Sequence, residues 1–282
     1  MSDAGMDYAE HPVPAELRRH VQCLWLLRDD APDDAIQTIW PDGRCELLAE
    51  FGVPLRFHGA DGAVRADQSL CFAAQQLGPI RLQAAGPVLC LGLRLAPACS
   101  GLIAGARLPG LRDHAPDLHT LDAAFASGFR AAAQAAIDTG SPEALWTLLR
   151  ARCAGFAPDP LAERAVDLLD GAEGDLRIAD LAKHLGVGLR TLQARFLEHV
   201  GMRPKEYARV RRLQALLRTL DAERTDIADA AARHGYSDHA HATRDLQRWT
   251  DTTPARLVRA LRGDPDGADA LRLAAAFVRG TS

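Results

Sequence analysis

The sequence predicts an α+β protein in which a small antiparallel β barrel or sandwich with helices precedes an all-α tandem helix-turn-helix domain. Three observations lead to this prediction. The N-terminal part contains several short strand-like runs separated by turn residues. The C-terminal part contains one helical pattern twice, at an offset of 49 residues. The length of 282 residues favours two domains, and the 48% hydrophobic content is sufficient for ordinary globular cores.

Short strands are predicted throughout the first 115 residues. The clearest is 88–95, where leucines alternate with other residues, which is the period of two expected of a strand. Pro41-Asp42-Gly43 is a strong turn signal, so the strands on either side of it are expected to pair as a hairpin. Short strands with frequent turns are typical of a small antiparallel barrel or sandwich. The predicted strands are residues 22–27, 35–40, 45–51, 69–74, 80–84 and 88–95.

Two helices are predicted after the strands, at residues 118–137 and 142–153. Their apolar stripes are more typical of a core or a dimer interface than of a cofactor site. Two prolines within 156–160 discourage a continuing helix, so this segment is the best candidate for a linker. A helix at 161–169 then opens the C-terminal domain, and residues 263–282 have the pattern of an appended amphipathic helix.

These boundaries divide the chain into four expected parts. They are a β-rich sensor or dimerisation domain (1–115), a helical connector (116–157), the double helix-turn-helix domain (158–262) and a tail helix (263–282). The whole chain is slightly acidic, with 33 Lys and Arg against 37 Asp and Glu. Residues 160–262 instead carry a small basic excess, which modestly favours an acidic partner for that part.

The repeated pattern spans residues 178–187 and 227–236, and five of its ten positions are identical in the two copies. In the first copy apolar residues follow i, i+3, i+4 and i+7, which is one face of a short helix. The ninth position is Gly186 in the first copy and Gly235 in the second. Glycine there supplies the positive φ that ends the helix and starts a sharp turn. A second helix follows each turn, so each copy predicts a helix-turn-helix.

A long helix over 204–220 is expected to join the two copies and to fix their relative position. If both copies engage DNA, their recognition helices should lie in successive major grooves, about 34 Å apart. Asp226 is a plausible N-cap for the second copy. In that copy Ala242 stands where the first has Leu192, and Trp249 is a candidate to refill the lost core volume.

The C-terminal motifs resemble the AraC/XylS family of bacterial transcription regulators. The residues that carry this resemblance are Leu192-Gln193-Ala194-Arg195-Phe196, Gly201-Met202-Arg203-Pro204 and His234-Gly235-Tyr236-Ser237-Asp238. The N-terminal half is similar to the sensor-like domain of a subset of these proteins. The residues that carry this second resemblance are Cys23-Leu24-Trp25, Trp40-Pro41-Asp42-Gly43 with Glu46-Leu47, and Gly92-Leu93-Arg94. It implies small-molecule binding or dimerisation for this domain, and a cytoplasmic DNA-binding regulator as the whole.

Residues near the start of each recognition helix are expected to face the major groove. Arg190 could pair with guanine and Gln193 with adenine, whereas Ala194 stands where an Arg is frequent in the family. His239-Ala240-His241 superficially suggests a metal pair, but groove-facing or surface histidines are the better interpretation. A basic run in the joining helix supplies candidate phosphate contacts, with a solvated helix face as the alternative. The predicted DNA contacts are Arg190, Thr191, Gln193, Ala194, His239, Thr243, Arg244, Arg209, Arg211 and Arg212.

A ligand site in the N-terminal domain is expected in the mouth or interior of the barrel, where small barrels often hold one molecule. Candidate residues are polar or amphipathic side chains on or beside the strands. Surface salt bridging and a structural tryptophan are the alternative interpretation, and a domain that only dimerises or scaffolds stays open. The candidates are Trp40, Arg44, Glu46, Gln75, Arg81 and Arg94.

Composition and motifs argue against other classes of protein. No run of 18 apolar residues predicts a membrane span, and the polar N-terminus has no signal-peptide core. Six cysteines without C-x-x-C spacing indicate buried or free thiols in a reducing cytoplasm, and a zinc or redox site is the alternative. No catalytic motif stands out, so neither an enzyme nor a cofactor is expected. Expected partners are double-stranded DNA, a small-molecule effector, RNA polymerase and a second copy of the chain, and not a membrane.

Overall fold

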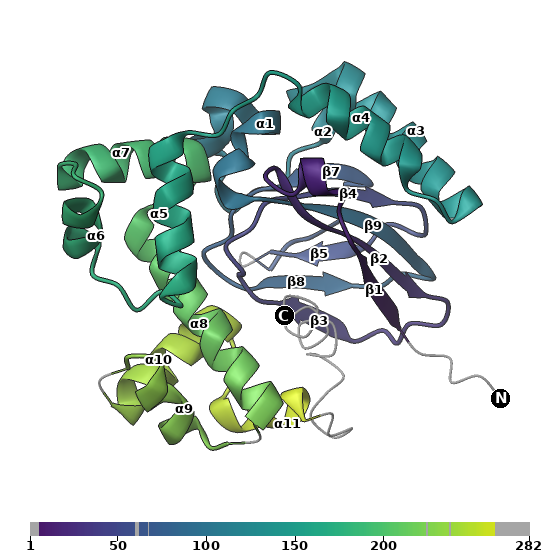
Figure 1. The fold of residues 1–282 in the computed structure, drawn as a ribbon. Coiled ribbons are helices and arrows are strands. Elements are labelled where there is room, and N and C mark those ends of the chain that lie inside the picture. The colour runs from purple at the N-terminus through teal and green to yellow at the C-terminus, as the bar shows by residue number, and fades with distance from the viewer. Residues whose placement is uncertain (1–5, 60–61, 67, 224, 237, 263–282) are drawn as a thin grey trace.

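The computed structural model describes residues 6–59, 62–66, 68–223, 225–236 and 238–262. It confirms the predicted α+β class, because antiparallel sheets form the N-terminal half and helices form the C-terminal half (Figure 1). Within these ranges no helix combines the length and the hydropathy that a membrane span requires. The tail helix predicted for 263–282 lies outside the described residues.

Two antiparallel sheets build the N-terminal half. The larger sheet has the order β1-β2-β9-β4-β7, and the smaller has the order β3-β8-β5-β6. Three of the nine strands in the described ranges, β1, β5 and β6, were not predicted from the sequence. The strands are β1 (Asp7–His11), β2 (Val21–Asp29), β3 (Ile36–Ile39), β4 (Glu46–Glu50), β5 (Arg56–His58), β6 (Val64–Ala66), β7 (Leu70–Ala73), β8 (Ile80–Gln83) and β9 (Val88–Leu95).

Strand alternation gives the larger sheet two different faces. Leu47 and Ala49 of β4 lie in a hydrophobic core that continues into helices α1 (Gly101–Ala104), α3 (Ala123–Thr139) and α4 (Glu143–Cys153). The neighbours in between, among them Glu46 and Leu48, line a cavity on the other face. This follows from the period of two along a strand, which sends successive side chains to opposite faces.

The predicted hairpin around Pro41-Asp42-Gly43 is wrong. β3 pairs with β8, whereas β4 pairs with β7 and β9 in the other sheet. The chain bends at Gly43, which adopts a φ of 81°. However, the carbonyl oxygens of Pro41 and Asp42 accept hydrogen bonds from a C-terminal helix and do not join a strand ladder. The segment therefore crosses from one sheet to the other.

The helix predicted over 118–137 is two helices, α2 (Leu118–Leu121) and α3. Asp122 separates them with an extended backbone, and its side chain accepts a hydrogen bond of 3.0 Å from the backbone N–H of Phe125. An N-cap of this kind satisfies one of the first N–H groups of a helix, so it begins a new helix at this residue.

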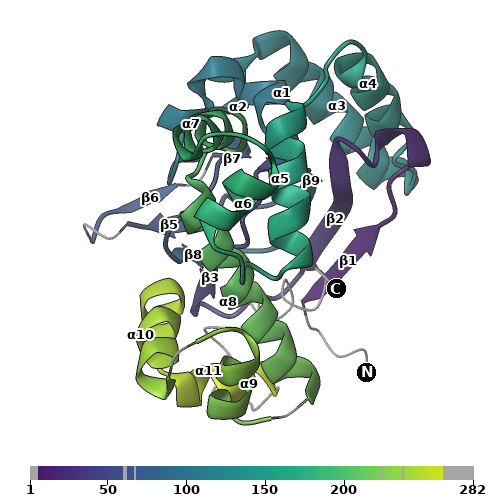
Figure 2. The same ribbon diagram turned by 60° about the vertical axis from the view of Figure 1, so that its left-hand side comes forward.

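The C-terminal half consists of two three-helix lobes and a helix that joins them (Figures 1 and 2). In both views α5, α6 and α7 lie around one part of α8, and α9, α10 and α11 lie around the other. Helix α11 was not predicted from the sequence. The helices are α5 (Pro160–Gly171), α6 (Ile178–His184), α7 (Leu189–Val200), α8 (Pro204–Glu223), α9 (Ile227–Arg233), α10 (His239–Thr250) and α11 (Pro254–Leu261).

The duplication seen in the sequence is a duplication of backbone geometry. Gly186 and Gly235 have φ of 68° and 69°, which confirms the positive φ predicted for both turns. The second helix of each helix-turn-helix, α7 or α10, also ends in a left-handed residue, Gly201 in the first copy and Asp251 in the second. The side chain of Asp226 accepts a hydrogen bond of 2.8 Å from the backbone N–H of Asp229, which confirms the predicted N-cap.

Each lobe has its own core. Leu192 and Phe196 of α7 are fully buried in the first lobe together with Tyr207 of α8. Ala242 of α10 is buried in the second lobe in the same cluster as Trp249. This placement agrees with the idea that the indole compensates for the small side chain.

All six cysteines are buried and none forms a disulfide, which confirms the interpretation as buried thiols. Burial raises the pKa of the thiols of Cys23, Cys45 and Cys99 to about 12. The thiolate is the nucleophilic form of cysteine, so these three side chains are held in an unreactive state.

We therefore expect Cys23, Cys45 and Cys99 to resist iodoacetamide at neutral pH in the folded protein. Peptide mass spectrometry of the alkylated protein would measure this. The same protein alkylated in guanidinium chloride is the control and should be modified at all three positions. Modification of any of the three in the folded protein, as fast as in the denatured one, would contradict the structure.

Gly92 of β9 allows the ring of Trp25 on β2 to lie directly against the sheet. A Cβ at position 92 would come within 2.0 Å of Trp25 Cε2. We expect Gly92→Ala to displace the ring and to lower the free energy of unfolding by about 1–3 kcal/mol, as overpacking usually does. Gly101→Ala is the matched control, because a Cβ there meets no atom within 4 Å. Urea unfolding that gave the same midpoint for both variants would refute this account of Trp25.

Candidate nucleic-acid interface and ligand cavity

The first predicted recognition helix, α7, presents the expected residues to solvent. Arg190, Thr191, Gln193 and Ala194 are all exposed. Their placement follows from the burial of Leu192 on the opposite side, because the 3.6-residue period turns the intervening positions outward. The surface is therefore open for contact with a duplex, and the individual base contacts stay predictions.

The second predicted recognition helix, α10, is more mixed. Asp238 caps it by accepting a hydrogen bond of 2.7 Å from the backbone N–H of His241. Arg244 is exposed, and its Nε donates to the carbonyl oxygen of Ala240 at 3.1 Å. Thr243 is half-buried, and its hydroxyl oxygen contacts no hydrogen-bond partner among the described residues. The side chain of His239 lies outside the part of the chain that the structure describes.

The three arginines predicted to contact phosphate all have partners within the protein. Arg209 forms an ion pair with Asp245 of α10 at 3.4 Å. Arg211 pairs with Asp170 of α5 at 2.8 Å, and its side chain is only 13% exposed. Arg212 pairs at 3.0 Å with the Asp175 carboxylate, which precedes α6. These contacts tie α8 to both lobes, and they give Arg211 in particular a structural role.

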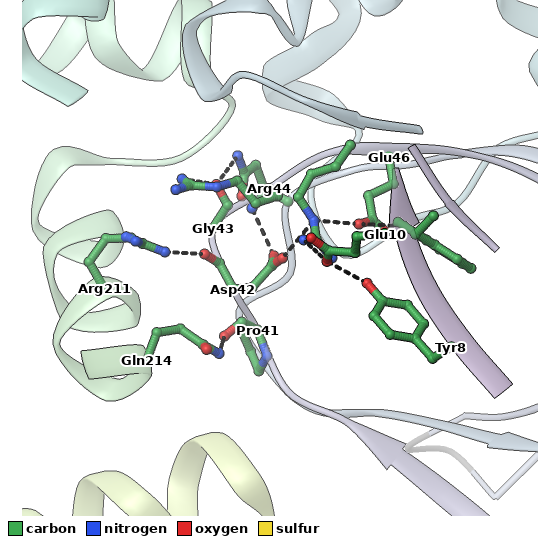
Figure 3. Close-up of polar contacts among 12 residues, drawn as sticks. Tyr8, Glu10, Pro41, Asp42, Gly43, Arg44, Glu46, Arg211 and Gln214 are labelled. Carbon is green, nitrogen blue, oxygen red and sulfur yellow. Dashed lines mark hydrogen bonds and ion pairs between the residues drawn. The ribbon is translucent and has the colours of Figure 1, made fainter. Parts of the chain in front are cut away.

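A five-residue segment of the N-terminal half, Trp40–Arg44, docks on α8. Gln214 Nε2 donates to the carbonyl oxygen of Pro41 at 2.7 Å, and this contact is buried. Arg211 Nη1 donates to the carbonyl oxygen of Asp42 at 3.2 Å. Figure 3 shows Arg211 and Gln214 reaching from the helix to this segment. Trp40 continues the contact, because it belongs to the hydrophobic core of the second lobe.

Arg44 extends the docking to the first lobe. Its guanidinium forms an ion pair with Asp170 at 3.0 Å and donates to the phenol oxygen of Tyr207 at 2.5 Å. Tyr207 in turn donates to Asp170 at 2.8 Å. Burial raises the pKa of the Tyr207 phenol, so that it stays a neutral donor. Gly43 lies flat against the same ring, where a Cβ would be 3.1 Å from Tyr207 Cε2.

Two further contacts hold the C-terminal half. Arg81 of β8 forms an ion pair with Asp251 at the end of α10. Gly201 at the end of α7 faces Leu108, where a Cβ would be 3.1 Å from Leu108 Cγ. Both recognition helices are thus fixed at their C-terminal ends by the N-terminal half, while the start of α7 stays exposed.

A cavity of about 330 Å³ lies between the two sheets. Four of the six predicted ligand residues line it, namely Trp40, Arg44, Glu46 and Arg94. The other two do not. Arg81 is engaged at α10, and Gln75 is buried and donates to the carbonyl oxygen of Gly43 at 3.0 Å. The apolar wall includes Trp25, Leu27, Ile39, Leu48, Leu55, Phe57 and Leu82.

One polar cluster forms part of the cavity wall, and in it Arg94 pairs with three carboxylates. Figure 3 shows these three acidic residues, Glu10, Asp42 and Glu46. The Nε of Arg94 donates to Glu46 at 2.8 Å and its Nη1 to Glu10 at 3.1 Å, and the Asp42 carboxylate lies 3.7 Å away. Trp25 Nε1 also donates to Glu46, at 3.2 Å. Burial raises the pKa of Glu46, against the lowering effect of Arg94.

Among the cavity residues that were not predicted from the sequence are Trp25, Asp42, Glu50 and Gln214. The first three carry a usable signal, because Glu46 and Glu50 share one face of β4 and Trp25 is on a predicted strand. Gln214 carries no such signal, since it reaches the cavity only through the docking of α8. No group of three or more His, Cys, Asp or Glu side chains suited to a metal ion occurs in the described ranges.

Comparison with known proteins gives one family match. Residues 181–260 match the family model described as a helix-turn-helix domain. These residues run from within α6 to within α11 and contain both glycine turns. No curated protein matches the sequence significantly.

Several solved structures are similar at low identity. ToxT from Vibrio cholerae has a TM-score of 0.47 and 10% identity over 83% of this chain and 97% of that one. Wild-type ToxT from Vibrio cholerae strain SCE256, solved with unsaturated fatty acid bound, has a TM-score of 0.45 and 12% identity. The match covers 81% of this chain and 91% of that one. The C-terminal domain of the response regulator AraT from Geobacillus stearothermophilus has a TM-score of 0.35 and 18% identity. The match covers 36% of this chain and 86% of that one.

The family match, the two lobes and the exposed start of α7 agree with one another. Residues 181–260 therefore carry an AraC-type helix-turn-helix domain.

Proposed function

We propose that this protein is a sequence-specific transcription regulator whose DNA binding responds to a small molecule held between the two sheets. In this proposal residues 1–115 are the sensor domain, 116–157 connect it, and 158–262 read DNA in the cytoplasm. RNA polymerase and a second copy of the chain are the further partners that a regulator of this type would engage.

The main support for this proposal is that Trp40 belongs to two parts of the structure. It lines the cavity and at the same time belongs to the core of the second lobe. Gln214 connects the same two places, because it lines the cavity from α8 and donates to Pro41. A molecule in the cavity would therefore contact residues that also hold α8. A ligand shifts a conformational equilibrium only if it binds the two conformations with different affinities, and contacts to Trp40 and Gln214 would provide such a difference.

For base reading we propose Arg190 and Gln193 in the first lobe and Arg244 in the second. Arginine suits guanine O6 and N7, and glutamine suits adenine N6 and N7. Arg209 and Arg212 are proposed as phosphate contacts that would require rearrangement of their present ion pairs. Arg211 is better explained by its contacts to Asp170 and Asp42.

We expect Arg190→Ala to weaken binding to a duplex selected from a random pool by the wild-type protein. One bidentate base contact is worth about 1–3 kcal/mol of discrimination, which is roughly a 5- to 150-fold loss. Binding to unselected duplex should change little, because it depends mainly on phosphate charge. Fluorescence anisotropy with both duplexes would measure this, with Arg150→Ala on α4 as a matched control. Equal loss on both duplexes would exclude base reading by Arg190.

The docking of Trp40–Arg44 should depend on Gln214. We expect Gln214→Met to leave the Pro41 carbonyl oxygen buried without its donor, which costs about 1–3 kcal/mol. Amide hydrogen exchange should then rise in α8 and in the Trp40–Arg44 segment. Gln134→Met on the exposed surface of α3 is the control. Unchanged exchange in the first variant would show that this contact does not hold the two halves together.

A further inference from the structure

We propose that the cavity selects apolar ligands that carry one positively charged nitrogen, such as an ammonium group, over carboxylates of the same length. This inference rests on the ligand-responsive function proposed above and names the chemical class of the ligand. It is drawn from the charges that line the cavity and from the way in which they are already paired.

Two of the three arginines in the cavity wall, Arg94 and Arg44, are already paired with other groups of the protein. Arg94 has a side chain that is only 4% exposed, and its donors are directed at Glu46 and Glu10. Arg44 is turned toward Asp170 and Tyr207. A ligand carboxylate would have to displace one of these pairs, and breaking a buried charge pair is costly. Arg65, which also lines the cavity, is exposed on β6.

Acidic groups exceed basic groups at the polar cluster. Three carboxylates, those of Glu10, Asp42 and Glu46, surround the single guanidinium of Arg94. Glu50 adds another buried carboxylate to the wall. Glu46 uses the same oxygen, Oε1, to accept from Trp25 and from Arg94. Burial raises the pKa of Glu46, and the negative charge of Asp42 raises it further. This is the direction expected where buried carboxylates outnumber buried cations.

Aromatic residues in the cavity wall also suit a cationic group. Trp25, Trp40 and Phe57 line the cavity, and the faces of aromatic rings attract cations.

The apolar residues of the cavity wall indicate that the rest of the ligand is apolar. Leu27, Leu48, Leu55 and Leu82 come from both sheets and line the cavity with the aromatic residues. A mostly apolar cavity with a few convergent polar groups is the usual form of a small-molecule site. The predicted ligand is thus an apolar body with a cationic nitrogen placed beside Asp42 and Glu46.

Three probes of equal chain length test this proposal: octylammonium, octanol and octanoate. Isothermal titration calorimetry of the full chain at neutral pH would give their affinities. A hydrogen bond to a charged group contributes enough for an affinity gain of about 10- to 100-fold. We expect octylammonium to bind more tightly than octanol by this factor, and octanoate to bind more weakly than octanol. Quenching of tryptophan fluorescence, reduced in Trp40→Phe, would place the probe in the cavity.

Two variants show whether the preference comes from the cluster. Glu46→Gln should remove most of the preference for octylammonium over octanol, and measurable octanol binding by this variant would show that the cavity still forms. Glu50→Gln provides a second acidic position if the first variant does not fold. Glu143→Gln, on the exposed surface of α4, should leave all three affinities unchanged.

The outcomes separate this inference from the proposed function. Octanoate binding as tightly as octylammonium, or a preference that survives both Glu46→Gln and Glu50→Gln, overturns the inference and leaves a ligand-responsive regulator in place. Absence of binding by all three probes overturns both the inference and the ligand-responsive half of the function. Base reading by Arg190 is measured separately and does not depend on either result.

Discussion

The docking of Trp40–Arg44 on α8 is the contact on which the arrangement of this protein depends. Helix α8 joins the two lobes, so a segment that fixes α8 also fixes both recognition helices. Its polar contacts are buried or partly buried, and they reach α8 and α5 from backbone carbonyl oxygens and from Arg44. Polar groups in such a place must be paired, because an unpaired one costs free energy. The contact is therefore specific as well as stabilising, and it holds the two halves in one relative position.

Arginines in this protein serve the interior as much as the surface. A basic run on a helix between two DNA-reading lobes would ordinarily be assigned to phosphate contacts. Here Arg211 is nearly buried against Asp170, and Arg209 and Arg212 hold acidic partners in the two lobes. The guanidinium group suits this use because it stays charged and offers several donors in a fixed geometry. The number of basic residues in a sequence segment therefore overestimates how many of them are free to contact DNA phosphates.

The larger sheet performs two tasks because its two faces are chemically different. One face completes a core with α1, α3 and α4, and the other forms a wall of the cavity. Gly92 makes the second face possible, since only a residue without a side chain lets Trp25 lie across it. Glu46 and Arg94 are directly opposite on β4 and β9, so the polar cluster is built from cross-strand neighbours. The same cluster includes Asp42, which precedes the strand and belongs to the segment that docks on α8.

The sequence by itself determined the features that depend on neighbouring residues. The glycine turns, the N-cap at Asp226, the outward positions of α7 and most of the strands follow from local periodicity and backbone preference, and the structure confirms them. Only the tertiary structure decided that β3 and β4 belong to different sheets, that Arg81 meets Asp251 and that Gln214 borders the cavity. These contacts join residues far apart in the chain, and they form only when large apolar faces have packed. No local sequence pattern predicts which residues become partners in such long-range contacts.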